Sequence, residues 1–349
     1  MDSFISVIIP ALNAGRVIDR CLTALSHQTL DRAQYELLVV DDGSRDDTAE
    51  RAKAQGARVV RLSVTLGPGG ARNAGISAAR GEIIVFTDAD CEPTASFLES
   101  LVTPLSDPRV GGTKGVYLSR QQELVARFVQ LEYEDRYRHT AMTRWIDFVD
   151  TYAACFWKRD LERVGGFDPM FRQCGDQELS FRLADAGVHI RFVPEARTFH
   201  LHANRLSSYL KKKFGIGWWK VAVLSRHPGK AVRDSHTPQM MKLELAAAVS
   251  LAGSVLAAGP LALMGSGALG ISLLLGTLAL FLACTAPFLT RAIWKDWKVG
   301  LVSPAVLLAR DLALVSGLLL GIKQAPREAA QKQTSWLDSV SKSDPSLVR

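Results

Sequence analysis

A long uncharged stretch in the second half of the chain limits what the protein can fold into. From Leu245 to Thr290, 46 consecutive residues include no Asp, Glu, Lys or Arg. A helix needs roughly 20 apolar residues to cross a bilayer, so this stretch is long enough for two crossings. Three glycines lie where a tight turn would join them: Gly265, Gly267 and Gly270. We predict a transmembrane hairpin over 245–264 and 268–289, because a buried pair in a soluble protein normally keeps a polar stripe.

A third apolar segment, residues 299–322, carries two charges at its middle, Arg310 and Asp311. Central charges cost roughly 2.5–3.5 kcal/mol each, while Val, Leu and Ile return roughly 0.3–0.6 kcal/mol each. The segment has 13 such apolar residues, so the two sums nearly cancel. It therefore fits three arrangements: a crossing, an interfacial helix, or a helix packed on the hairpin with its charges paired.

The net charge of +7 is concentrated next to the hairpin. Nine Lys and Arg and one acid, Asp234, lie between Arg205 and Lys242. Such a basic segment favours the cytoplasmic side and attracts anionic membrane lipid. Three basic residues after the hairpin agree with this orientation: Arg291, Lys295 and Lys298. We expect no nucleic-acid partner, because no binding motif accompanies the charge.

The start of the chain, MDSFISVIIP, lacks the basic start and the long apolar run of a signal peptide. We therefore predict a multi-pass protein of the cell (inner) membrane whose main domain faces the cytoplasm. Five cysteines form no CxxC pair, so the sequence indicates neither a zinc site nor a disulfide framework.

The first half alternates strand-like and helix-like patterns. Apolar runs of strand length cover 5–10, 35–40, 57–62 and 83–87, with helical spacing between them. This order predicts an α/β domain with a mainly parallel, Rossmann-like sheet and helices on both faces. We divide the chain into an α/β domain (1–204), a basic juxtamembrane segment (205–244), membrane helices (245–322) and a polar tail (323–349).

Pairs of aspartates follow two of these strands: Asp41 with Asp42, and Asp88 with Asp90. Parallel sheets bind ligands at the carboxyl ends of their strands. In extended backbone Asp88 and Asp90 share a face, and two carboxylates about 4 Å apart repel by roughly 4 kcal/mol at an effective dielectric near 20. A divalent cation relieves this repulsion, and oxygen ligands favour Mg²⁺ or Mn²⁺. An isolated DxD is more often a solvated turn, but its place after a fourth strand favours the metal site.

Asp42 suits the recognition of a nucleotide base, and equally the capping of a helix after Asp42-Gly43-Ser44. A glycine-rich segment, LGPGGARNAG, lets a ligand approach a helix start, where Arg72 favours an anion. Arginine at position 72 breaks GxGxxG, and no GxxxxGK[ST] occurs, so NAD-enzyme and P-loop functions are disfavoured.

Six segments in this order resemble the family 2 glycosyltransferases with the GT-A fold: SVIIPALN, VVDDGS, GPGGARNAG, IIVFTDADCEP, VGGFD and GDQELSFRLADAG. The resemblance implies inverting sugar transfer from a nucleotide diphosphate donor, usually UDP-linked. It makes Asp42 the base-contacting acid, Asp88 the DxD residue near the ribose, and Asp90 the metal ligand. It also assigns further residues to the donor site: Pro10, Asn13, Asp41, Gly69, Arg72 and Ala89.

The same resemblance makes Asp176 the catalytic base, although Gly175 stands where the family often has Glu, and a helix cap is the alternative for Asp176. His200 matches a further metal or phosphate contact. Processive synthases carry QxxRW after the base, whereas the RW here, Arg144-Trp145, precedes it and lacks the Gln. The resemblance thus implies non-processive transfer.

We therefore expect a membrane-anchored, metal-dependent glycosyltransferase that adds a sugar to a lipid-linked or membrane-proximal saccharide acceptor in the cell envelope. A catalytically inactive scaffold with this fold and a nucleotidyltransferase are the alternatives.

Overall fold

The computed structural model describes residues 3–232, 235, 237 and 239–343, with side chains up to residue 322 except at 232. The chain divides into two compact units, which we describe separately. The first unit comprises Met1–Arg120, Arg136–His202 and Pro326–Arg349. The second unit comprises Gln121–Asp135 and Ala203–Ala325. Helices α5 (Leu124–Ala141) and α12 (Trp297–Ser343) contribute to both units, because a boundary between the units falls within each of them.

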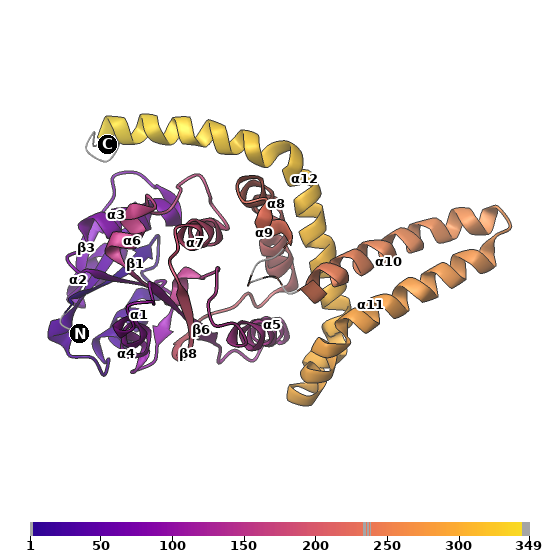
Figure 1. Ribbon diagram of the computed structural model, residues 1–349, viewed down its shortest axis with the longest axis horizontal. Coiled ribbons are helices and arrows are strands. Elements are labelled where there is room, and N and C mark those ends of the chain that lie inside the picture. The colour runs from indigo at the N-terminus through magenta and orange to yellow at the C-terminus, as the bar shows by residue number, and fades with distance from the viewer. Residues whose placement is uncertain (1–2, 233–234, 236, 238, 344–349) are drawn as a thin grey trace. The chain divides into compact units, whose positions relative to one another are not determined.

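An eight-stranded sheet forms the centre of the first unit, in the order β3-β2-β1-β4-β7-β6-β8-β5 (Figure 1). The pairs among β1, β2, β3 and β4 are parallel, as predicted, and β6 is also parallel to β8. Strand β7 is antiparallel to both neighbours, and β5 to β8. The bounds are β1 Ile5–Ala11, β2 Tyr35–Asp41, β3 Arg58–Arg61, β4 Ile83–Phe86, β5 Glu92–Pro93, β6 Gly112–Leu118, β7 Ala154–Trp157 and β8 Ile190–Phe199.

Helices cover both faces of this sheet. In the central strands, the residues that point to either face of the sheet are buried, and this explains why these strands have nearly continuous apolar sequences. Helices α3, α6 and α7 share one core cluster with β1, β2 and β4, while α1 and α4 lie across the sheet from them (Figure 1). Their bounds are α1 Ile18–Ser26, α2 Thr48–Ala54, α3 Gly67–Ala78, α4 Phe97–Val102, α6 Lys158–Arg163 and α7 Gly175–Asp185, with short 3-10 turns at Arg32–Gln34, Thr103–Ser106 and Thr151–Ala153.

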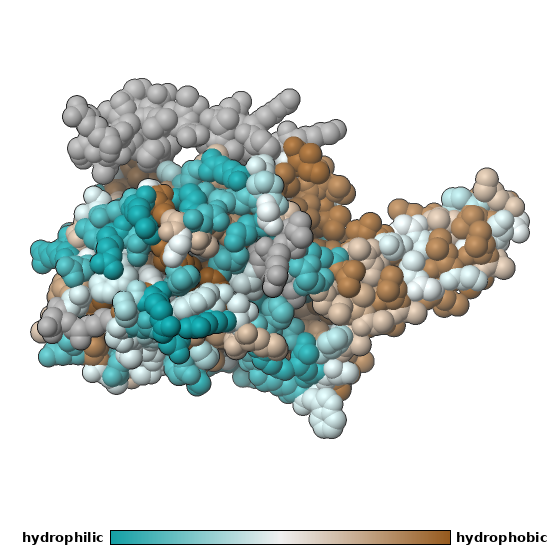
Figure 2. Space-filling view, in the orientation of Figure 1, coloured by the Kyte–Doolittle hydropathy of each residue, from teal (hydrophilic) through white to brown (hydrophobic). Residues whose placement is uncertain are grey.

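The second unit is helical and includes the predicted hairpin. Its elements besides α5 are α8 Leu206–Arg226, α9 Gly229–Val232, α10 Gln239–Leu263, α11 Gly267–Lys295 and α12 Trp297–Ser343. Helices α10 and α11 run side by side, and Figure 2 shows mainly brown and pale, weakly polar residues over them. The hydroxyls of Ser254 and Thr277 hydrogen-bond between the two helices at 2.8 Å. Both helices extend beyond the predicted 245–264 and 268–289.

Among the described residues, three helical segments are long and apolar enough to cross a membrane: Gln239–Leu263, Gly267–Lys295 and Trp297–Ile322. The third contains the apolar segment 299–322, for which the central charges allowed three arrangements from the sequence alone. Helix α12 continues to Ser343, so residues 323–343 of the predicted polar tail are helical, and residues 344–349 lie outside the described part. The backbone of α12 approaches α8 closely, since a Cβ on Gly317 would lie 2.1 Å from the Phe214 carbonyl oxygen.

The charges of the third segment are paired inside this unit. Arg310 bonds Asp311 at 2.7 Å, Glu244 at 2.8 Å and Glu132 at 3.3 Å, and it is 4% exposed. Lys213 also bonds Glu132, at 2.8 Å. We call this group the buried charge cluster; its members are Glu132, Tyr209, Lys213, Glu244, Arg310 and Asp311. It joins α5, α8, α10 and α12, and it explains how this apolar helix holds an arginine and an aspartate.

Candidate active site

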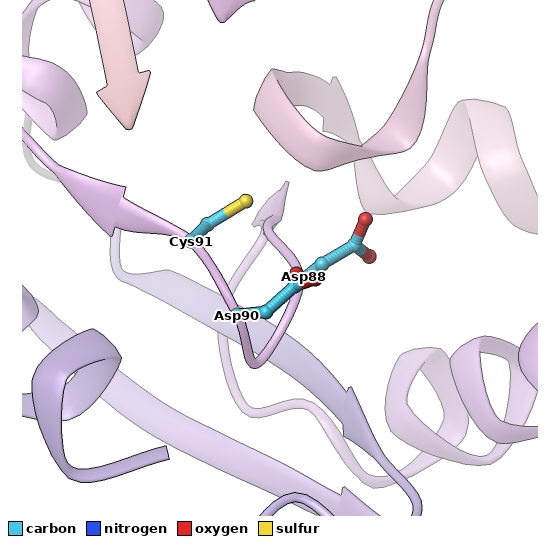
Figure 3. A group of neighbouring side chains, drawn as sticks. All are labelled: Asp88, Asp90 and Cys91. Carbon is cyan, nitrogen blue, oxygen red and sulfur yellow. The ribbon is translucent and has the colours of Figure 1, made fainter. Parts of the chain in front are cut away.

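The loop between β4 and β5 carries the DxD residues (Figure 3). Ligand atoms of Asp88, Asp90 and Cys91 all lie within 4.8 Å of one another. The Asp88 and Asp90 side chains are 32% and 42% exposed, whereas Cys91 is completely buried. Because β4 and β2 both pair in parallel with β1, this loop and the Asp41-Asp42 loop emerge at the same edge of the sheet.

Arg72 connects the glycine-rich helix α3 to this loop. Its Nη2 lies 2.7 Å from Asp88 Oδ1, and its guanidinium lies 5.6 Å from the centre of the Phe167 ring. Its buried Nε has no hydrogen-bond partner in the part of the chain that the structure describes. The neighbouring Asn73 side chain donates to the Phe167 carbonyl at 2.7 Å and accepts from its N–H at 2.7 Å, so α3 also holds the VGGFD loop.

Asp42 is fixed at the start of α3. Its carboxylate accepts hydrogen bonds from the N–H groups of Leu66 at 2.7 Å and Gly67 at 2.9 Å. Burial raises the pKa of Asp42, although these two bonds oppose the shift. Asp42 therefore caps α3, not the helix that follows it in the sequence, and its contact with a nucleotide base stays a prediction.

Three further predicted donor-site residues line the same edge. Asn13 has a φ of 51°, donates its N–H to Ser44 Oγ at 2.9 Å and accepts from the Arg45 N–H at 2.9 Å. Pro10 is half-buried near the end of β1, and Ala89 is 5% exposed between the two aspartates.

Two other predicted donor-site residues, Gly69 and Asp41, contribute to packing and to a turn in the structure. Gly69 lies against the VGGFD loop, where an added Cβ would be 3.4 Å from Phe167 Cβ. Asp41 accepts from the Ser44 N–H at 2.8 Å and is completely buried. Contact of these residues with a donor stays a prediction.

Asp176 lies in the first turn of α7, where its Oδ1 accepts from the Gln177 N–H at 2.9 Å. Arg182 anchors this helix by donating to the Gly166 carbonyl at 2.8 Å and pairing with Glu178 at 2.7 Å. Burial and then the Asp150 charge raise the pKa of Asp176, while Arg72 and Lys114 oppose the shift, and together these effects bring the pKa to about 6. Arg72 thus bonds Asp88 directly, and its charge also acts on Asp176.

Sequence reasoning missed Lys114 and Asp150. Lys114 Nζ lies 2.5 Å from Asp150 Oδ2 and 4.8 Å from the centre of the Phe148 ring, and Lys114 is only 2% exposed. Its burial lowers its pKa, while the Asp150 charge opposes that shift. The one available signal was a lysine inside the apolar run 110–118. Asp150 supplies a second carboxylate near the base, which Gly175 does not.

His200 follows β8 and reaches the DxD loop, with its Nε2 3.4 Å from Asp90 Oδ2. Two carboxylates and an imidazole are donors that suit Mn²⁺ or Mg²⁺, and the exposed aspartates leave room for phosphate oxygens. Burial, and then the charges of Asp88 and Asp90, raise the pKa of the Cys91 thiol well above its usual value. A neutral buried thiol is a poor ligand for these cations, so Asp88, Asp90 and His200 are the better fit.

Comparison with known proteins identifies the family of this chain. The family described as Glycosyl transferase family 2 matches residues 6–164. Glycosyltransferase AglE of Haloferax volcanii is 30% identical over 232 residues, which cover 63% of this chain and 74% of that protein. The pre-mycofactocin glycosyltransferase of Mycobacterium tuberculosis is 28% identical over 236 residues, 65% of this chain and 48% of that protein. This chain therefore matches about half the length of the second relative.

Among solved structures, the mannosyltransferase PcManGT from Pyrobaculum calidifontis, in complex with GDP-Man and Mn²⁺, superposes with a TM-score of 0.60. It is 20% identical, and the match covers 92% of this chain and 88% of that one. The first unit thus has the GT-A fold of enzymes that use nucleotide sugars. The chain belongs to glycosyl transferase family 2, and it is a glycosyltransferase.

Proposed function

We propose that the enzyme transfers one sugar per encounter from a nucleotide diphosphate donor, UDP-linked in our hypothesis, to a lipid-linked or membrane-proximal acceptor, with inversion and with Mn²⁺ or Mg²⁺. One observation carries the proposal: Asp88, Asp90 and His200 lie at one sheet edge, and Arg72 acts on both Asp88 and the Asp176 base.

In this proposal Asp176 takes the proton of the acceptor hydroxyl while that oxygen bonds the anomeric carbon. The bond from this carbon to the diphosphate oxygen breaks on the opposite face, so the configuration inverts. A base whose pKa is about 6 is largely ionised at neutral pH and still accepts a proton effectively.

The leaving diphosphate needs positive charge. Asp88, Asp90 and His200 would hold the divalent cation, which neutralises the diphosphate when it is bound. Arg72 keeps Asp88 in place, and its buried Nε, which has no hydrogen-bond partner among the described residues, lies at this site. Asp42 at the start of α3, with Asp41, would contact the nucleotide base, and Asn13 shapes the loop beside them.

The acceptor part of the proposal rests on the second unit. In the described part of the chain, the first of three helices suited to a membrane begins at Gln239, within the last residues of the basic segment 205–244, and the other two follow. The basic end of α11 is paired with acids of α5 that lie outside the apolar stretch: Arg291 with Asp135, and Lys295 with Glu134. Charged pairs of this kind belong in water at the membrane boundary, and we place this boundary on the cytoplasmic side of the cell membrane.

The test uses the full chain in detergent micelles or nanodiscs with Mn²⁺. A panel of UDP-sugars and GDP-sugars is screened for donor hydrolysis, then for transfer to extracted membrane lipids. GDP-linked donors are included because PcManGT was solved with GDP-Man. We expect one donor to be consumed by the wild type, and both Asp90→Ala and Asp176→Asn to transfer its sugar far more slowly.

Product analysis separates the alternatives. Release of a nucleoside diphosphate supports sugar transfer, whereas release of inorganic pyrophosphate from a nucleoside triphosphate would show a nucleotidyltransferase. Loss of activity in Asp90→Ala with unchanged activity in Asp176→Asn would remove Asp176 from the base role.

A further inference from the structure

A second histidine lies directly behind the one that reaches the DxD loop. His200 Nδ1 and His202 Nδ1 are 3.3 Å apart, while His200 Nε2 points the other way, 3.4 Å from Asp90 Oδ2. His202 is 6% exposed. The two ring nitrogens of His200 thus face different groups, one at the cation site and one inside the protein.

Aromatic contacts hold both rings in this orientation. The Tyr117 ring stacks on His200 with centroids 4.3 Å apart and meets His202 edge-on at 5.7 Å. Tyr117 in turn stacks on Tyr152, and its N–H donates to Tyr137 Oη at 2.8 Å. The imidazole of His200 is therefore packed before any ligand arrives.

The facing nitrogens restrict where the proton of His200 lies. Two neutral imidazoles whose Nδ1 atoms form a hydrogen bond share a single proton between those atoms. A neutral histidine binds a cation through Nε2 only when its own proton is on Nδ1. That tautomer needs an acceptor at Nδ1, and His202 Nδ1 lies in that position.

We propose that His202 is a positioning residue: it accepts the Nδ1–H of His200 and so keeps the Nε2 lone pair of His200 directed at the cation beside Asp90. This inference rests on the proposed function, since it requires that the DxD site binds a divalent cation. Hydrogen-bond partners of metal-ligating histidines typically change metal affinity about 10- to 100-fold when they are removed.

The test measures Mn²⁺ affinity without any sugar donor, by following free Mn²⁺ in electron paramagnetic resonance titrations of the full chain. His202→Phe keeps a ring but removes the acceptor, and we expect it to weaken binding about 10- to 100-fold. His202→Asn places an amide oxygen near the lost nitrogen and should restore most of the affinity. His189→Phe, at the residue just before β8, is the matched control and should bind like the wild type.

A double variant separates positioning from general damage. In a His200→Ala background, His202→Phe should cause no further loss, because His202 acts through His200. Wild-type affinity in His202→Phe, or an additional loss in the double variant, would overturn the inference while Asp90→Ala still confirms the cation site. No Mn²⁺ binding by the wild type would overturn the inference together with the metal part of the proposed function. Thermal unfolding without Mn²⁺ checks that each variant is folded.

Discussion

The carboxylates of the DxD loop and those of the buried charge cluster are compensated in different ways. Asp88 and Asp90 are 32% and 42% exposed, and the internal groups beside them are Arg72 and His200. In the cluster, by contrast, the side chains of Glu132, Asp311 and Arg310 are at most 8% exposed, and Arg310 bonds both carboxylates directly. The first arrangement suits an exchangeable cation from solution, while the second supplies permanent cations from the chain itself.

This difference teaches how to separate function from stability in one molecule. Removing one partner of a buried ion pair lowers the free energy of unfolding by several kcal/mol, because the remaining charge is buried without a partner and without water. Removing the partner of an exposed carboxylate changes the free energy of unfolding little, because water solvates the carboxylate in its place. Changes in the DxD region should therefore act on activity, and changes in the cluster should act on folding.

The largest expected effect is on catalysis. Asp176→Asn should lower kcat about 10²- to 10⁴-fold, because the amide cannot accept the acceptor proton. The same change should raise stability by about 1 kcal/mol, as neutral replacements in strained active sites often do. Transfer assays and thermal unfolding of the same preparations measure the two effects.

The stability gain of Asp176→Asn should depend on pH. A folded-state pKa raised to about 6 from 3.8 means that folding disfavours the charged form. The gain is therefore fully present above about pH 6 and disappears below the unfolded carboxyl value near 3.8. A gain that is equal at pH 4 and pH 8 would contradict this assignment.

In the buried charge cluster, Arg310→Met should destabilise the protein by about 3–5 kcal/mol, because Glu132, Glu244 and Asp311 would keep their charges without this partner. Chemical unfolding in detergent measures the loss. Arg120→Met is the matched control: Arg120 is 67% exposed in its pair with Glu92, so it should change stability by less than about 0.5 kcal/mol. Equal losses for the two variants would mean that burial does not distinguish the two environments.

A smaller effect concerns the pH dependence of transfer. Asp176 works as a base when ionised, so kcat/KM should fall about tenfold per pH unit below its pKa of about 6. Asp150→Asn removes a charge that raises this pKa, and the acid limb should move to lower pH. A pH profile at saturating Mn²⁺ checks the shift, and a limb that stays in place or moves upward would contradict the role of Asp150.

The smallest expected effect is on the stability of the DxD loop. Asp90→Asn should change the free energy of unfolding by less than about 0.5 kcal/mol in the absence of cations, since the side chain is 42% exposed. The same variant should lose the thermal stabilisation that Mn²⁺ gives the wild type. A large loss of stability without cations would instead give Asp90 a structural role.

Much of the first unit could be predicted because its signals are local. The parallel strands are apolar on both faces, and the aspartates directly follow them, so strand ends and acids appear together in the sequence. The hairpin was equally visible, because one uncharged stretch holds both helices. The periodicity of apolar residues and the distribution of charges along the sequence are enough to predict such features.

The partners of buried charges could not be predicted in this way. Arg310 hydrogen-bonds Glu132, which lies 178 residues earlier in the chain. Lys114 likewise hydrogen-bonds Asp150, and no sequence motif links these two residues. Asp42 shows the same limit: its neighbours in sequence suggested a cap for the next helix, whereas its carboxylate binds the start of α3, 24 residues on. Long-range hydrogen bonds follow from how the strands and helices pack in three dimensions, which local patterns do not specify.

The central claim is that the nucleotide sugar binds with a divalent cation held by Asp88, Asp90 and His200. Calorimetric titration of the preferred donor into the full-length protein, with Mn²⁺ and then with EDTA, tests it most directly. We expect donor binding with Mn²⁺ in the wild type, and loss of most of that affinity in EDTA and in Asp90→Asn. Equal donor affinity in all three conditions would contradict the claim.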